Sequence, residues 1–134
     1  MVRDRISHVA VSLLLLHASS LASSCSKSSG TSNDIAFACE IDPTPSRVGK
    51  NTFTVTLTAG GGDRLAGAHI SLEGDMSHPG MSPVFSETKE IGPGRYQGTL
   101  DLNMRGDWSV LFHVTLPSGR TFDRQVTIRN IQAT

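Results

Sequence analysis

Strict alternation of apolar and polar side chains runs through the chain from residue 35 onward. It is clearest in NTFTVTLT (51–58), where every second residue is apolar, and in DWSVLFHVTL (107–116), where large apolar residues recur at the same interval. A period of two residues is the side-chain period of a β-strand that buries one face. No window of the chain has the spacing of an amphipathic helix, so this part is predicted to fold from strands alone.

Seven segments carry this pattern or a shorter version of it, and clusters of glycine, proline and aspartate separate them. Short strands that follow one another every 8–12 residues or so, joined by turns, are typical of an antiparallel sandwich. The sequence therefore predicts an all-β, immunoglobulin-like antiparallel β-sandwich of about seven strands, with a small open barrel as the alternative. The expected strands are 35–41, 51–58, 67–73, 84–91, 95–102, 107–116 and 120–129.

The N-terminal segment has a different character. It begins with two arginines, continues with an apolar run over 9–16 and ends in small residues, which is the layout of a secretory signal peptide. The apolar run is shorter than the roughly 20 residues that a permanent membrane span requires. We therefore expect a signal peptide over 1–24, a flexible polar tether over 25–34 and one β-sandwich domain over 35–134.

The end of this segment, LASSC, resembles a bacterial lipobox, in which the cysteine receives lipid after cleavage. Ala22 stands where that motif usually has leucine, and an ordinary cut after Ser24 would also leave Cys25 first. We expect lipidation at Cys25, and thus an exported lipoprotein that is membrane-anchored in the bacterial cell envelope and faces the periplasm or the extracellular side. Cys39 would then be a small buried apolar residue, whereas without lipidation the two cysteines could form a disulfide.

The charge balance argues against some functions. Lysine and arginine together number 12, as do aspartate and glutamate, so no strongly basic field exists to attract nucleic acid. The chain has no nucleophile elbow, paired catalytic carboxylates or zinc-protease motif. We therefore expect a binding protein and not an enzyme.

The loop DMSHPGMSP (75–83) is the most unusual stretch, because it places methionines on either side of a histidine between two strands. Successive loops of an antiparallel sandwich alternate between its two ends, which brings this loop to the same end as NMRGD (103–107). Thioether sulfur and imidazole together suit Cu(I). The predicted ligands of a Cu(I) site are Met76, His78 and Met81, with Met104 as a possible fourth.

Other uses of these residues are compatible with the same pattern. Methionine fills irregular gaps, so the side chains could plug the open end of the sandwich, with His78 in solvent. Exposed methionines could also scavenge or sense oxidants. His69 and His113 form a separate pair on the outward faces of neighbouring strands, where two solvated histidines are the usual case and a metal site is the alternative.

The stretch PTPSRVGKNTFTVTLTAGGGDRLAGAHISLEGDMSHPGMSPV, followed by GPGRYQGTLDLNMRGDWSVLFHV, resembles the YtkA-like domain, which is related to FixH-like proteins. The resemblance covers about residues 43–128, and GRYQGTLDLNMRGDW (94–108) is its most specific run. It implies an extracytoplasmic β-sandwich that is often lipid-anchored. FixH-like relatives are associated with copper delivery and the assembly of haem–copper oxidases. The resemblance therefore implies copper handling, with a copper-dependent oxidase, a transporter or another membrane protein complex as partner. A module that docks on such a complex without any metal is the competing interpretation.

Overall fold

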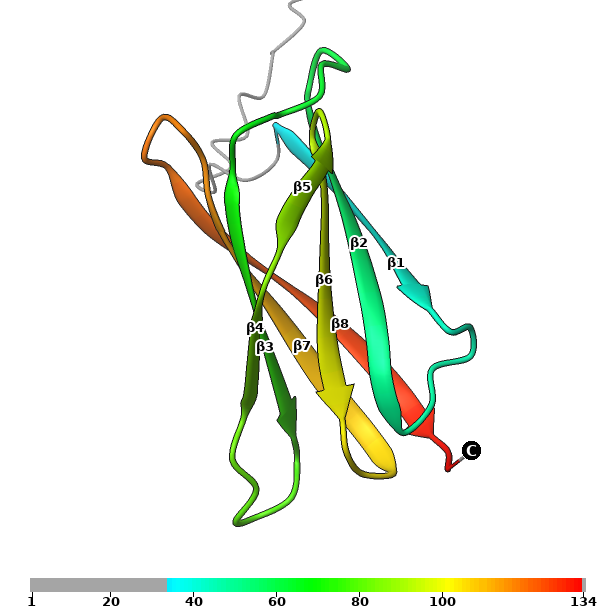
Figure 1. Cartoon of the computed structure of the whole chain (residues 1–134). Coiled ribbons are helices and arrows are strands. Elements are labelled where there is room, and N and C mark those ends of the chain that lie inside the picture. The colour runs from blue at the N-terminus through cyan, green and yellow to red at the C-terminus, as the bar shows by residue number, and fades with distance from the viewer. Residues whose placement is uncertain (1–33, 134) are drawn as a thin grey trace, which may run out of the picture.

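The computed structural model describes residues 34–133, which form two four-stranded antiparallel sheets that pack face to face (Figure 1). One sheet has the strand order β1-β2-β6-β5 and the other β4-β3-β7-β8. The predicted all-β sandwich is thereby confirmed. The strands are β1 (Ile35–Asp42), β2 (Gly49–Ala59), β3 (His69–Met76), β4 (Val84–Glu87), β5 (Lys89–Gly92), β6 (Arg95–Leu102), β7 (Gly106–Thr115) and β8 (Thr121–Ile131).

The predicted signal peptide, the lipidation site Cys25 and the tether up to residue 33 lie outside the described residues. Within residues 34–133, no apolar helix reaches the length needed to cross a membrane.

The segment predicted as one strand over 84–91 is in fact two strands in different sheets. β4 pairs with β3, whereas β5 pairs with β6, and the chain changes sheets at Thr88. The backbone N–H and the hydroxyl of Thr88 both donate to the carbonyl of Ile70, at 3.0 and 2.9 Å. These bonds stabilise the crossing. The change of sheet divides the expected strand in two, which is why eight strands are found where about seven were expected.

The core consists of the inward-facing residues of both sheets, as the alternation predicted. Every second side chain from Trp108 to Val114 in β7 is buried, and the alternation continues to Leu116 just after the strand. Phe112 lies at the centre, where its ring makes edge contacts with Phe37 and Phe53 at centroid distances of 5.1 and 6.0 Å. Burial of this apolar face stabilises the packing of one sheet on the other.

The two ends of the sandwich are closed differently. At the end where β1 begins, Arg120 forms a two-pronged ion pair with Asp34, with a shortest nitrogen–oxygen distance of 2.7 Å. At the opposite end, the backbone N–H of Val48 donates to the carbonyl of Gln132 at 2.9 Å. The loops β3–β4 and β6–β7 lie at this second end, with the C-terminus (Figure 1).

Candidate metal-binding rim

The loop 77–83 and the turn 103–105 lie at the same end of the sandwich, as strand parity predicted (Figure 1). We call these two segments the rim. They follow β3 and β6, which lie in opposite sheets and both run toward this end, as their arrowheads show (Figure 1). The rim holds three of the four predicted metal ligands, His78, Met81 and Met104, and the fourth precedes it directly.

Met76 is the last residue of β3 and belongs to the core. Its side chain is 4% exposed, and its backbone pairs with that of Trp108 on β7. A Cβ at Gly106 would lie 3.2 Å from Cε of Met76, so the methionine packs closely over that glycine. This position corresponds to the plug role that the sequence left open beside ligation.

His78 and Met81 occupy a tight turn within the rim. The N–H of Met81 donates to the carbonyl of His78 at 3.3 Å, and Gly80 between them has a φ of 86°. A positive φ favours glycine because it has no Cβ to clash, so Gly80 lets the loop fold back on itself. The His78 side chain is exposed, while that of Met81 is partly buried against the core.

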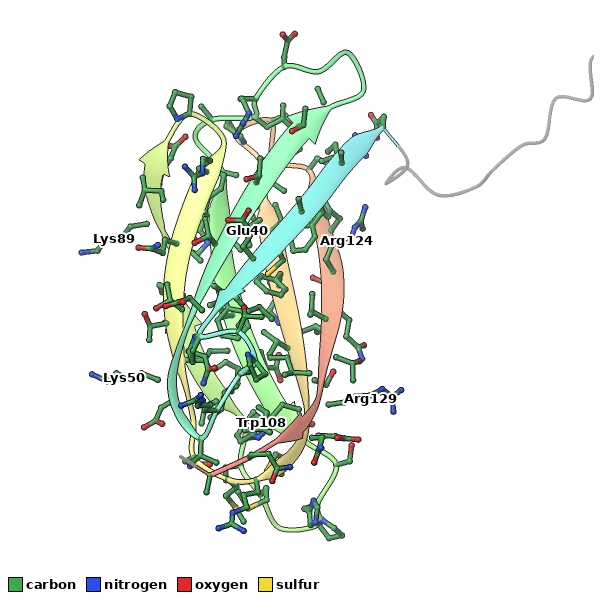
Figure 2. The ribbon with its side chains drawn as sticks, turned by 90° about the vertical axis from the view of Figure 1, so that its right-hand side faces the viewer. Glu40, Lys50, Lys89, Trp108, Arg124 and Arg129 are labelled. Carbon is green, nitrogen blue, oxygen red and sulfur yellow. The ribbon has the colours of Figure 1, made fainter. Side chains whose placement is uncertain are left out.

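Met104 in the second rim segment is the most accessible of the described methionines. Its side chain is 42% exposed, while its carbonyl accepts a hydrogen bond from Nε1 of Trp108 at 3.0 Å. Figure 2 shows Trp108 at this end of the sandwich. The buried indole therefore anchors the backbone of the turn and leaves the thioether at the surface.

The side chains of the rim offer only certain kinds of metal-ligand atoms. Among residues 34–133, no group of three or more His, Cys, Asp or Glu side chains is arranged to hold a metal ion. An ion at the rim would depend on thioether sulfur and one imidazole. That set suits a soft monovalent ion such as Cu(I). It contains no thiolate and only one imidazole, whereas zinc sites usually combine several such ligands.

Most of this domain matches a known protein family. A family model described as YtkA-like matches residues 30–113, a span that includes both rim segments. The chain belongs to the YtkA-like family. No curated protein and no solved structure matches the chain significantly.

Cys39 of this YtkA-like domain is a free, half-buried thiol on β1. Burial, with a smaller contribution from the neighbouring Glu40, raises its pKa to about 11 from an ordinary value of 9.0. Since the thiolate is the reactive form, the raised pKa makes Cys39 a poor nucleophile.

This leads to a test of Cys39 reactivity. At pH 8, iodoacetamide should alkylate Cys39 at least about tenfold more slowly in the folded protein than in urea, because the thiolate fraction falls about tenfold for each unit of pKa. Mass spectrometry of the Cys39 peptide over time measures both rates. Equal rates in the folded and the unfolded protein would show that the thiol is not buried and that its pKa is not raised.

The two histidines on the outward face occupy diagonally adjacent positions of β3 and β7, because His69 pairs with Thr115 and His113 pairs with Ser71. His69 contacts Glu87 at 3.0 Å, whereas His113 contacts Glu73 at 2.8 Å and Asp123 at 2.9 Å. Each imidazole thus has carboxylate partners of its own. The partners of His113 depend on the register between strands, which the pattern within a single strand does not specify.

Proposed function

We propose that this YtkA-like protein binds Cu(I) at the rim and transfers it to a partner protein. The supporting observation is that two loops, separated along the chain by three strands, bring His78, Met81 and Met104 to one end of a rigid sandwich. Two of these side chains are accessible and the third is partly buried, so all three are near the surface.

The chemistry of transfer follows from the ligand types. Thioethers carry no proton at neutral pH, so they bind a metal without releasing protons, unlike thiols. Neutral ligands near the surface can exchange one at a time with those of a partner. Met76 could act as a further Cu(I) ligand only if its side chain turned away from Trp108 and Gly106. In its present position it packs in the core next to the rim.

We also propose that the protein acts in the cell envelope, exported and held by lipid at Cys25. β1 begins at the end opposite the rim (Figure 1). An anchor that precedes β1 would therefore attach to the far end of the sandwich and leave the rim available. The partner would be a copper-dependent oxidase, a transporter or another membrane protein complex, and the activity would be binding and not catalysis.

A Cu(I) titration tests the proposal. The purified protein, titrated anaerobically against a competing Cu(I) chelator, should bind one ion, and the fluorescence of Trp108 should change because its indole contacts the Met104 backbone. Replacement of Met81 by leucine should weaken binding at least about tenfold, or about 1.4 kcal/mol, while leaving thermal stability nearly unchanged.

Histidine variants provide the matched control. His78→Gln should weaken Cu(I) binding, whereas His69→Gln, which removes an imidazole from the outward face of β3, should not. If the protein takes no Cu(I) from the chelator, the copper proposal is wrong. If Met81→Leu lowers stability instead of affinity, the methionines serve as a core plug.

A second function, docking on a membrane complex without metal, is favoured by one observation. The short edge strands β4 and β5 carry large exposed apolar side chains, with Phe85 70% and Ile91 50% exposed.

A double variant tests this docking function. Replacing both Phe85 and Ile91 by serine should abolish cross-linking to a membrane partner in cells but leave Cu(I) binding intact. Loss of the cross-link only in the His78→Gln variant would point to the rim instead.

A further inference from the structure

The outward face of the sheet β4-β3-β7-β8 carries a row of polar side chains in cross-strand register. Glu87 on β4 pairs with Ser71 on β3, which pairs with His113 on β7, which pairs with Asp123 on β8. Glu73 lies two residues beyond Ser71 on the same face of β3. Side chains in such positions are near enough to interact directly.

His113 uses both of its ring nitrogens. Nε2 lies 2.8 Å from Oε2 of Glu73, and Nδ1 lies 2.9 Å from Oδ1 of Asp123. Ionised carboxylates only accept hydrogen bonds, and a neutral imidazole has a single N–H to donate. Both contacts can be hydrogen bonds at once only if both ring nitrogens carry protons, which makes the ring an imidazolium.

The surroundings of His113 favour that charged form. Its side chain is 38% exposed, compared with 30% for Glu73 and 63% for Asp123, so the ring is partly shielded from solvent. The hydrogen bonds that His113 donates to Glu73 and, to a smaller extent, to Asp123 raise the pKa of His113, against a smaller opposing effect of burial. The other ionisable side chains on this face are His69, which contacts Glu87, and the exposed Asp75 on β3 and Arg129 on β8. Arg124 on β8 donates to the backbone carbonyl of Asp123.

We propose that Glu73, His113 and Asp123 form a proton-dependent clamp across β3, β7 and β8. When both ring nitrogens are protonated, His113 on β7 donates one hydrogen bond to Glu73 on β3 and one to Asp123 on the edge strand β8. Loss of one proton leaves one carboxylate facing a ring nitrogen that has no hydrogen, so one of these two hydrogen bonds is lost. The clamp is independent of the rim and of any metal.

The direction of the pH effect follows from linkage. A group whose pKa is higher in the folded than in the unfolded state stabilises the fold fully below the unfolded value, which is about 6.5 for histidine. That stability is lost as the pH rises through the folded pKa, and between the two values the unfolding constant increases by at most about tenfold per pH unit. The protein should therefore unfold more readily in mildly alkaline than in mildly acidic solution.

Nitrogen NMR of the imidazole and urea unfolding test the clamp in the purified protein. At pH 6.5, where free histidine is about half neutral, both ring nitrogens of His113 should carry protons. Glu73→Gln and Asp123→Asn should each lower the midpoint of the His113 titration. His113→Gln should remove the loss of stability between pH 6.5 and 8, a range below the titration of Cys39, while His69→Gln on the same face should retain it.

Two results would overturn the clamp. One is a His113 ring with a single protonated nitrogen at pH 6.5, which the wild-type protein reports without any substitution. The other is a titration midpoint that neither carboxylate variant lowers, which would mean that the two contacts do not hold the proton.

Discussion

Replacing Trp108 by alanine should lower the free energy of unfolding by about 3–5 kcal/mol, the usual cost of removing a buried large aromatic side chain. Trp108 is 2% exposed and pairs in register with Met76 on one side and Ile128 on the other. Its removal would leave a cavity at the junction of three strands and would free the carbonyl of Met104. Such a loss is a large share of the roughly 5–15 kcal/mol that stabilises a typical domain.

Urea unfolding followed by circular dichroism measures this effect, because the variant has no tryptophan fluorescence. Trp108→Phe is the informative companion, since it keeps an aromatic ring in the core but cannot donate to Met104. We expect it to be less destabilising than alanine and, if the indole holds the rim, to weaken Cu(I) binding as well. A loss below about 1 kcal/mol for Trp108→Ala would be far short of the range for buried aromatic residues and would contradict the core position.

Replacing Gly98 by alanine should destabilise the protein by about 3 kcal/mol, at the upper end of what overpacking costs. A Cβ at Gly98 would lie 2.9 Å from Cδ1 of Leu72, 3.0 Å from Cγ2 of Thr88 and 3.1 Å from the backbone carbonyl oxygen of Glu87. The side chains can shift slightly, but the carbonyl belongs to the segment where the chain passes from β4 to β5. Relief of the clash therefore requires the crossing itself to move.

Gly61→Ala in the β2–β3 loop is the control, because a Cβ there would meet nothing within 4 Å. Thermal or urea unfolding of both variants should separate them clearly, with Gly61→Ala close to the wild type. Similar stabilities for the two variants would show that the β4–β5 crossing is not tightly packed against β6.

The residues of the rim illustrate how far the sequence leads toward a site. Strand parity alone was sufficient to bring the loop 77–83 and Met104 to one end, because antiparallel connections alternate between ends. Strand parity could not show which of the methionines are buried and which are exposed. Met76 continues the alternation of β3 and lies in the core, whereas Met104 lies in a turn whose backbone is held by a distant indole.

The sequence by itself determined the class of fold and the faces of the strands, because side-chain alternation is a local property that each strand displays independently. It also predicted the membership of the YtkA-like family. Only the tertiary structure decided where the chain changes sheets at Thr88 and which carboxylates contact His113. Both depend on the register and approach of strands far apart in the chain, and these are set by packing between elements and not by the pattern within any one of them.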